Sequence, residues 1–360
     1  MTKILDNVIT AFADYTPGLP PHSSGKITVE QINHGLINNS YKIIPEFKPA
    51  FLLQQINRNV FPKPQDVQRN YIHIYEYAEY EFTGLRLPRP QYYTNNRTLL
   101  KDRDGNYWRA FEFIEKAHSQ TVAETPSQAK AAAKAFAKFT AAFEDFNIDL
   151  LKIVIPDFHN LAFRYQQFEQ SLEGELYERM AKSKKLVEEL KNRERYKHFF
   201  EIIISSEEFP LRLMHHDAKI SNVLFDNETN KVVCLVDFDT AMPGYFFSDI
   251  GDLIRTLVSP VDEASIEFDK VKVRKSYYDA IVSGYVSVME KILTDAEKKY
   301  IHYAGLLMTY MQALRFLTDY LNGDVYYKTN YEQQNFDRAF NQFTLLQSLE
   351  ESVKTELLQL

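Results

Sequence analysis

The hydrophobic pattern of this chain changes period about one third of the way along, and that change restricts the fold more than any other feature. Residues 25–114 contain short apolar or alternating runs that predict strands, interrupted by one helical stretch at residues 64–84. Beyond them, apolar residues recur three and four apart, which predicts a helix-rich region with one short β insert at residues 222–238. The pattern therefore predicts an α+β chain with two domains, residues 1–114 and 115–360.

Turn-forming residues separate the strands predicted in the first domain. Asp104-Gly105 is a hairpin signal between two apolar runs, and Pro88 and Pro90 end the helical stretch before a further strand. Residues 1–15 have apolar side chains at helical spacing, which predicts a short amphipathic helix rather than a signal peptide. The expected strands lie at residues 26–33, 40–44, 51–56, 91–94, 98–101 and 106–114.

Composition excludes several classes of protein. Hydrophobic residues make up 45% of the chain, enough for a substantial core, and 11 glycines in 360 residues are too few for a collagen or a flexible linker. The net charge of −7 and the lack of a basic block exclude a dedicated surface for nucleic acid or an anionic membrane. Cys234 is the only cysteine, and no apolar run is long enough to cross a membrane. We expect a cytoplasmic protein, either a monomer or a homodimer, with no nucleic-acid or membrane partner.

Four polar residues border the β insert, whose two strands are expected at residues 222–225 and 231–238. Asp217 lies five residues before Asn222, ahead of the first strand, and Asp237 and Asp239 end the second. Phosphoryl transfer needs a carboxylate for the acceptor's proton and hard oxygen ligands for magnesium, and protein kinases use this spacing. Turn chemistry also favours Asp and Asn here. Because the preceding run is apolar, however, we expect both later aspartates to be desolvated and to need a cation.

Three motifs around this insert occur in a fixed order: His215-x-Asp217 with Asn222, Val236-Asp-Phe-Asp239, and Ser248-Asp-Ile-Gly-Asp-Leu-Ile254. They resemble the aminoglycoside phosphotransferase and choline kinase superfamily. The resemblance implies a bilobed, protein-kinase-like α+β fold, in which a small antiparallel β lobe is followed by a larger helical lobe carrying a catalytic β-hairpin. It also implies roles for single residues: Asp217 as catalytic base, Asn222 and Asp237 as Mg²⁺ ligands, Asp239 at a second metal or its water, and His215 and Asp249 as supports of the catalytic loop.

Four further segments are similar to the N-acetylhexosamine 1-kinases. This narrower similarity extends over about residues 25–350 and implies that the chain transfers the γ-phosphate of ATP to the anomeric hydroxyl of N-acetylglucosamine or N-acetylgalactosamine. The segments are Asn33-His-Gly-Leu-Ile-Asn-Asn-Ser40, Leu52-Leu-Gln-Gln-Ile-Asn57 with Val60-Phe61, Asp239-Thr-Ala-Met-Pro-Gly244, and Arg315-Phe-Leu-Thr-Asp-Tyr-Leu-Asn-Gly-Asp-Val-Tyr-Tyr327.

The expected nucleotide site departs from the protein-kinase pattern in two places. Residues 33–41 contain one glycine, Gly35, where kinases have a glycine-rich loop. The phosphates are therefore expected to bind backbone groups and the side chains of Asn38, Asn39 and Ser40.

The third strand carries Gln54 where a phosphate-binding lysine is expected, with Arg58 just beyond it. The usual acidic partner of that lysine would be Glu76 or Glu79 on the following helix. Adenine is expected to contact the backbone of Glu112 through Ile114, after the last strand of the sheet.

For the sugar, Asp217 is expected to contact the reacting hydroxyl, because a base must lie within hydrogen-bond reach of its proton. Arg315 is the second candidate, since an arginine beside an apolar helix stripe needs an acceptor, and a structural pair with Asp319 four residues on is the alternative. Tyr245 is a candidate wall of the acetamido pocket, with core packing as the alternative.

Two other functions stay open. A kinase acting on choline, homoserine or an aminoglycoside would need an acidic or aromatic cage for its cationic acceptor. A nucleotide-binding pseudokinase would explain the missing glycine loop and lysine, but it gives no physical reason to keep Asp217, Asn222 and Asp237 together.

Overall fold

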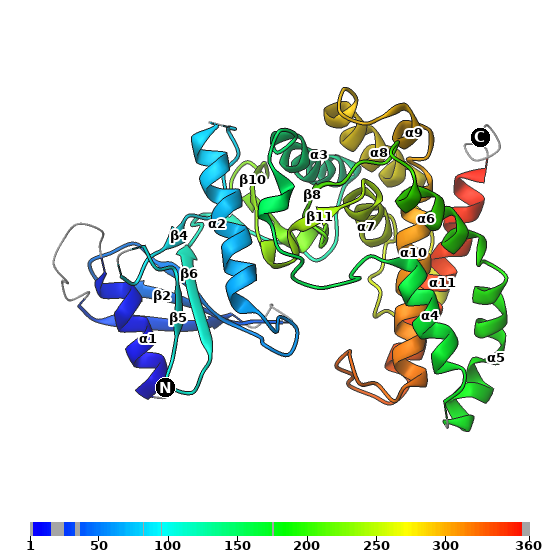
Figure 1. Cartoon of the computed structure of the whole chain (residues 1–360), viewed down its shortest axis with the longest axis horizontal. Helices are drawn as coiled ribbons and strands as arrows, with labels where there is room; N and C mark the ends of the chain where they lie inside the picture. Colours follow the sequence, from blue (N-terminus) through cyan, green and yellow to red (C-terminus); the bar gives the residue numbers. More distant parts are fainter. Residues whose placement is uncertain are drawn as a thin grey trace. The chain divides into compact units, whose positions relative to one another are not determined.

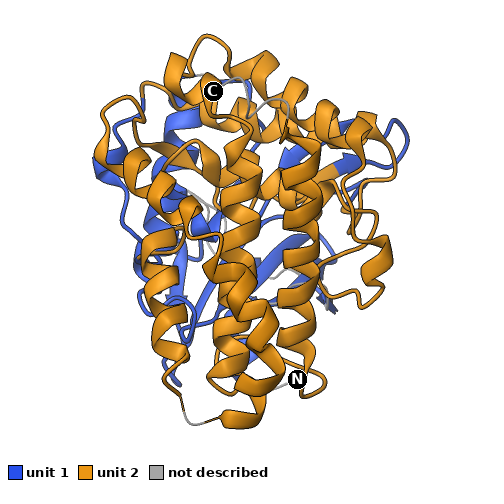
Figure 2. Cartoon of the chain, turned by 90° about the vertical axis from the view of Figure 1, so that its right-hand side faces the viewer, with its two compact units in different colours: residues 1–118, 146–156, 225–242 blue, residues 119–145, 157–224, 243–360 orange. Residues whose placement is uncertain are grey.

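The computed structural model describes residues 3–15, 25–32, 37–81, 83–94, 96–174 and 176–354. Figure 1 shows the helices and strands along the chain. The chain forms two compact units, each discontinuous in sequence (Figure 2). Unit 1 comprises Met1–His118, Phe146–Pro156 and Phe225–Met242, and unit 2 comprises Ser119–Asp145, Asp157–Leu224 and Pro243–Leu360. The division at residue 114 stays a prediction about domains. Most of the β insert, residues 225–242, clusters with unit 1.

Unit 1 contains an antiparallel sheet with the strand order β1-β2-β3-β6-β4, and β5 pairs with β6. The strands are β1 (Ile27–Ile32), β2 (Asn39–Pro45), β3 (Phe51–Ile56), β4 (Pro90–Gln91), β5 (Leu99–Lys101) and β6 (Tyr107–Glu112). The predicted hairpin between β5 and β6 turns at Gly105, whose φ of +84° glycine adopts without steric cost. In the register of β3 against β6, Gln54 lies opposite Arg109.

Two helices contribute apolar faces to unit 1. The predicted amphipathic helix α1 (Lys3–Asp14) joins a buried cluster with β2, β3 and β6. α2 (Pro64–Tyr80) begins at a proline, whose missing N–H would have been unpaired there anyway. The ring of Tyr71 on α2 contacts those of Phe111 and Phe238, with centroids 5.0 and 5.5 Å apart. The cluster consists of Leu5, Val8, Ile9, Phe12, Ala13, Ile43, Phe51, Leu53, Trp108 and Ala110.

The predicted β-hairpin forms from β9 (Val223–Asp226) and β10 (Val232–Leu235), with β7 (Ala117–His118) on the other side of β9. The Asp226 carboxylate accepts hydrogen bonds from the backbone N–H groups of Glu228 (3.2 Å) and Thr229 (2.8 Å), which closes the turn. β10 ends earlier than predicted because Asp237 has a left-handed φ of 65°, which cannot continue a strand.

Unit 2, orange in Figure 2, is mainly helical. Its long helix α10 packs against α4, α7 and α11. Two short strands pair with each other, β8 (Arg212–Met214) and β11 (Met242–Gly244). Within the described ranges, no helix combines the length and apolar character needed to cross a membrane. The helices are α3 (Pro126–Ala142), α4 (Leu161–Ser171), α5 (Tyr177–Lys191), α6 (Arg195–Ser205), α7 (Phe247–Leu257), α8 (Lys275–Met289), α9 (Asp295–Lys299), α10 (Tyr303–Leu321) and α11 (Gln334–Ser352).

Candidate active site

The loop between β8 and β9 carries the predicted base, and a buried carboxylate holds its backbone. Asp249 on α7 accepts hydrogen bonds from the backbone N–H groups of His215 (2.9 Å) and His216 (2.8 Å). His216 has a φ of 63°, a left-handed conformation that is uncommon for residues other than glycine. The two hydrogen bonds offset the cost of this conformation, so Asp249 fixes the chain direction just before Asp217.

A close approach of α7 and α10 brings Asp249 to this loop. Gly251 lies against α10, where a Cβ would come within 2.4 Å of the carbonyl oxygen of Ala304. Burial raises the pKa of Asp249 to about 7, and the hydrogen bonds from His215 and His216 oppose that rise. The carboxyl group that supports this loop is therefore expected to change its protonation near neutral pH.

Asp217 is partly exposed, and two side chains of its own loop contact its carboxylate. Asn222 Nδ2 donates to Asp217 Oδ2 at 2.8 Å, and Lys219 Nζ forms an ion pair with the same oxygen at 2.8 Å. Burial alone would raise the pKa of Asp217, but the charge of Lys219 and these hydrogen bonds lower it below its usual range. Asp217 is thus ionised at neutral pH, as a proton acceptor must be.

The two histidines before Asp217 have different surroundings. His215 is fully buried, and its ring meets Phe136 of α3 edge-on, with centroids 5.1 Å apart. The ring of His216 approaches His159, and the two Nδ1 atoms are 3.2 Å apart. Burial and then the charge of His216 lower the pKa of His159 well below its usual value, so His159 is neutral.

A pocket of about 260 Å³ in unit 2 contains the predicted sugar-binding residue Arg315. Arg315 lies on α10, and its guanidinium is 5.3 Å from the ring centroid of Phe158 and 5.7 Å from that of Tyr327. Two arginines and two tyrosines therefore shape one small concave surface. The pocket is lined by Arg164, Gln167, Arg315, Thr318, Asp319, Asn322, Val325, Tyr326 and Tyr327.

The predicted structural pair between Arg315 and Asp319 does not form. Asp319 instead accepts hydrogen bonds from the backbone N–H groups of Tyr326 (2.8 Å) and Tyr327 (2.9 Å), which orders the segment after α10. Arg315 donates to Gln312 Oε1 at 3.2 Å. Among the described residues that line the pocket, Asp319 is the only carboxylate, and it is already committed to backbone N–H groups.

The second arginine of the pocket, Arg164, likewise forms no ion pair with a carboxylate of the described residues. It donates to Gln167 Oε1 (2.9 Å) and to the carbonyl oxygen of Phe158 (3.2 Å). Burial and the nearby charge of Arg315 lower the pKa of Arg164 to about 10, which keeps it protonated at neutral pH. Among the described residues, its Nε–H and the hydroxyl of Thr318 are buried without a hydrogen-bond partner. Such unmet donors are costly. The two guanidinium groups that line the pocket suit it to a polar or anionic ligand.

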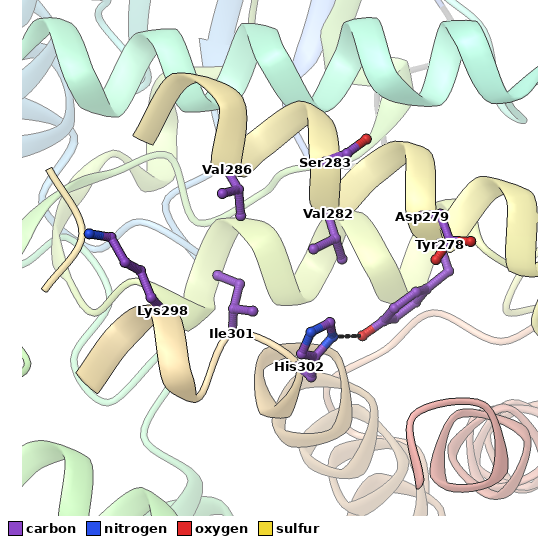
Figure 3. A pocket seen from close by; sticks show the side chains of 8 residues that line it. All are labelled: Tyr278, Asp279, Val282, Ser283, Val286, Lys298, Ile301 and His302. Atoms are coloured by element: carbon purple, nitrogen blue, oxygen red, sulfur yellow. Dashed lines mark hydrogen bonds between the residues drawn. The ribbon is translucent and has the colours of Figure 1, made fainter. Parts of the chain in front are cut away.

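The predicted wall residue Tyr245 does not line this pocket. Its ring stacks on Phe247, with centroids 6.1 Å apart and planes inclined by 10°. A second pocket, of about 450 Å³, is shown in Figure 3; there Tyr278 and His302 share a hydrogen bond of 2.7 Å. The second pocket contains none of the predicted site residues.

In unit 1, the two aspartates after β10 differ in exposure. The expectation that both are desolvated is wrong for Asp237, which is exposed at the left-handed turn that ends the strand. Asp239 is buried, and its Oδ2 accepts a hydrogen bond of 2.7 Å from Asn38 Nδ2. Its Oδ1 pairs with the guanidinium of Arg109 on β6. The cation that Asp239 needs is therefore supplied by a protein side chain.

Three of the predicted phosphate-binding side chains converge on this ion pair. Asn38 contacts Asp239, and Ser40 Oγ accepts a hydrogen bond of 3.1 Å from Gln54 Nε2. Asn39 points elsewhere and donates to Gln55 on the exposed face of the sheet. The start of the same motif, residues 33–36 with Gly35, lies outside the described residues.

The predicted adenine-binding segment follows β6. The N–H of Glu112 donates to the carbonyl oxygen of Arg89 (2.8 Å), and that of Phe113 donates to Ala50 (3.3 Å). The N–H of Ile114 makes no backbone hydrogen bond within the described part of the chain. Of the N–H groups expected to bind adenine, Ile114 therefore offers the uncommitted one.

Each residue predicted to hold magnesium offers an oxygen of the kind that the ion binds in proteins. Within the described ranges, no three His, Cys, Asp or Glu side chains form a cage for a metal. Magnesium in phosphoryl-transfer sites commonly takes one or two protein oxygens and completes its shell with phosphate and water. Asn222 turns its nitrogen to Asp217, which leaves Oδ1 as an oxygen donor, and Asp237 is an exposed carboxylate.

Comparison with protein families gives a match over residues 28–273, to the phosphotransferase enzyme family. The chain belongs to this family. As a family member it is a phosphotransferase of the small-molecule kinase type, and the coarser of the two resemblances seen in its motifs is confirmed.

Solved structures show the same fold at low identity. An aminoglycoside phosphotransferase from Alicyclobacillus acidocaldarius is 15% identical with a TM-score of 0.59, over 95% of this chain and 98% of that one. A choline kinase from Cryptosporidium parvum is 15% identical with a TM-score of 0.58, over 98% and 96%. A Plasmodium vivax ethanolamine kinase is 14% identical with a TM-score of 0.55, over 88% and 82%. The α+β, protein-kinase-like fold predicted from the sequence is confirmed.

Four residues at the candidate site of this phosphotransferase were not predicted from the sequence: Arg109, His159, Arg164 and Lys219. Lys219 had an available signal, a cation two residues after the predicted base. Arg109 can be recognised only from the strand register, which sets it opposite Gln54. His159 and Arg164 lie far from the motifs in sequence, and only tertiary packing brings them to His216 and Arg315.

Proposed function

We propose that this phosphotransferase transfers the γ-phosphate of ATP, with Mg²⁺, to the anomeric hydroxyl of an N-acetylhexosamine, giving the sugar 1-phosphate and ADP. The pocket at Arg315 carries the proposal. Within the described part of the chain, its two arginines form no ion pair with a carboxylate, and guanidinium N–H groups suit the hydroxyl and acetamido oxygens of a sugar. The same charges repel a cationic acceptor. Part of the pocket wall lies in the segment from Arg315 to Tyr327, which is similar to the N-acetylhexosamine 1-kinases.

A series of ring contacts within unit 2 connects this pocket with the loop of Asp217. Arg315 lies over the ring of Phe158, which stacks on His159 at a centroid distance of 4.5 Å. His159 in turn meets His216 at 5.0 Å, and His216 precedes Asp217. The Arg315 pocket and the loop of Asp217 therefore belong to one packed part of unit 2, and the proposal requires the bound sugar to reach from Arg315 to the Asp217 carboxylate.

In the proposed reaction, the anomeric oxygen attacks the γ-phosphorus while its proton passes to Asp217, and the bond from phosphorus to the bridging oxygen of ADP breaks. Asn222 holds the Asp217 carboxylate in place by two hydrogen bonds, one to Oδ2 and one from the same nitrogen to the backbone oxygen. Lys219 keeps that carboxylate ionised. Its ammonium is also a cation available to the charge on the transferred group.

Asn222 and Asp237 are the proposed ligands of Mg²⁺, which when bound neutralises charge on the phosphates of ATP. Adenine is proposed to accept a hydrogen bond from the N–H of Ile114 and to lie against the backbone of Glu112. Asn38 and Ser40 remain the proposed polar contacts of the phosphates.

Kinases of choline, homoserine or aminoglycosides remain the principal alternative. A cationic acceptor would need carboxylates at the acceptor pocket, but the one carboxylate lining the Arg315 pocket, Asp319, is bonded to backbone N–H groups. The remaining alternative, a pseudokinase, predicts no turnover with any acceptor.

The test measures ADP release with ATP and Mg²⁺ against N-acetylglucosamine, N-acetylgalactosamine, choline, homoserine and an aminoglycoside, with the Asp217→Asn variant as blank. The proposal predicts turnover with at least one N-acetylhexosamine and none with the cationic acceptors. Turnover with a cationic acceptor alone would contradict it.

A further inference from the structure

The sequence places Gln54 where kinases carry the lysine that binds nucleotide phosphates, so this chain needs another cation for that task. In unit 1, a cation lies beside Gln54. Arg109 on β6 lies directly opposite Gln54 on β3 in the antiparallel register, so the two side chains share one face of the sheet. Gln54 Oε1 accepts hydrogen bonds from Arg109 Nε (3.2 Å) and Nη2 (2.9 Å).

The acidic partner of this cation also differs from the expected one. Glu76 and Glu79 on α2 are exposed, and neither forms an ion pair among the described residues. The carboxylate that pairs with Arg109 is Asp239, in the segment after β10. Arg109 is 2% exposed and Asp239 is 4% exposed. Taking two charges out of water is costly, so a gain in stability alone does not account for a buried ion pair.

The guanidinium of Arg109 has N–H donors that form no hydrogen bond with the described residues. Of its five N–H groups, Nε and Nη2 supply those that bind Gln54 and Asp239. Nη1, with two N–H groups, makes no hydrogen bond within the described residues. It is also not fully buried, so it keeps some contact with solvent. One edge of the group therefore remains available for the oxygens of a ligand, and paired N–H groups of arginine match phosphate oxygens.

The position of Arg109 along β6 suits a nucleotide. Arg109 precedes Ile114, whose N–H is the proposed adenine donor, by five residues on the strand that leads into that segment. In extended chain this is a separation of about 16 Å, on the scale of an ATP molecule laid along the strand. Asn38 and Ser40, the proposed phosphate contacts of β2 and its preceding loop, lie at the Arg109 end, bonded to Asp239 and Gln54.

We propose that Arg109 binds the phosphates of the nucleotide in place of a lysine on β3, and that Asp239 acts as its positioning residue. This assignment rests on the proposed function, since it requires the chain to bind ATP. It also gives Asp239 a different role from the metal ligand predicted from the sequence, and it leaves Asp237 as the carboxylate for Mg²⁺.

The test compares the affinities for ATP with Mg²⁺ and for adenosine, measured by calorimetry on the full chain. Arg109→Lys keeps the charge beside Asp239 but removes the free Nη1 donors. We expect ATP affinity to fall about tenfold or more, as for a lost hydrogen bond to a charged group, with adenosine affinity unchanged. Arg58, the exposed arginine just beyond β3, provides the matched control, and Arg58→Gln should change neither affinity.

A double variant, Gln54→Lys with Arg109→Gln, moves the cation to the strand where kinases carry it and keeps a charge beside Asp239. We expect it to bind ATP at least as tightly as Arg109→Lys. Equal losses for ATP and adenosine in both variants, or a selective loss of ATP in Arg58→Gln instead, would overturn the proposal. Because no acceptor is present, the result is independent of the sugar: a selective loss of ATP affinity supports Arg109 even if no N-acetylhexosamine is phosphorylated.

Discussion

Asn222 directs its side-chain nitrogen at Asp217, donating to the carboxylate at 2.8 Å and to the backbone oxygen at 2.9 Å. This relationship explains why the two residues are separated by five positions. The short helical turn Ile220–Asn222 brings the amide back over the loop, so that one side chain orients the proposed base and still offers an oxygen to a metal.

Replacing Asp217 by Asn should lower kcat by about 10²–10⁴-fold, because the proton of the acceptor hydroxyl then has no base. ATP affinity should stay nearly unchanged, since the proposed contacts of the nucleotide lie elsewhere. Steady-state kinetics and ATP titration test this together. Unchanged turnover would remove Asp217 from its role.

Lys219→Met should shift the pH dependence of activity. The folded-state pKa of Asp217 is lowered, after the opposing effect of burial, chiefly by the charge of Lys219. Without that charge the pKa rises, so the acid limb of the kcat/KM profile should move to higher pH. Lys231→Met, at an exposed lysine of the β9–β10 turn, is the control and should leave the profile in place. An unmoved acid limb in Lys219→Met would contradict the role given to this ion pair.

The raised pKa of Asp249 predicts that the free energy of unfolding depends on pH. Its folded-state pKa, raised by burial to about 7, lies above the usual value of an aspartate, so the folded state binds the proton more tightly than the unfolded chain. The stabilising contribution is complete below about pH 4 and is lost as the pH rises through 7. The Tm of the wild-type chain, measured relative to that of Asp249→Asn, should therefore fall by several degrees from pH 5 to pH 8. A difference that does not change with pH would show that Asp249 does not titrate in this range.

Arg315→Ala should raise the KM for the acceptor about tenfold or more, with little change in the KM for ATP, because the guanidinium is proposed to bind only the sugar. Asn322→Ala, at a neutral residue of the same pocket, offers a comparison in which the cation is kept. If the KM for the acceptor is the same in Arg315→Ala and the wild type, Arg315 serves packing against Phe158 and Tyr327 alone.

Asp237→Ala should abolish the dependence of ATP affinity on Mg²⁺, since this exposed carboxylate is the proposed ligand. Titration of ATP with and without Mg²⁺ measures the effect. Retention of the full magnesium dependence would place the metal on other residues.

Much of the fold was predictable because its signals are local. The spacing of Asp217 and Asn222, the turn cluster of the hairpin at Asp226 and the hairpin glycine Gly105 each depend on a few neighbouring residues. Asp249 was assigned to the catalytic loop by its motif, and the structure brings its carboxylate to the backbone of that loop.

The rest depends on contacts between distant parts of the chain. Hydropathy places Asp237 after a buried strand, but the left-handed turn that exposes it is a backbone property. Arg109 and Gln54 are 55 positions apart, and only the register of β3 with β6 sets them face to face. The acidic partner of Arg109 follows from the packing of residues after β10 against the sheet, which no periodicity encodes.

The most direct test of the central claim is to identify the product formed from N-acetylglucosamine, ATP and Mg²⁺ by ³¹P NMR, with the 1-O-methyl glycoside of the same sugar as control. The account predicts a phosphate coupled to the anomeric proton, and no product from the methyl glycoside. Phosphorylation of the methyl glycoside, or a phosphate on another hydroxyl, would contradict it.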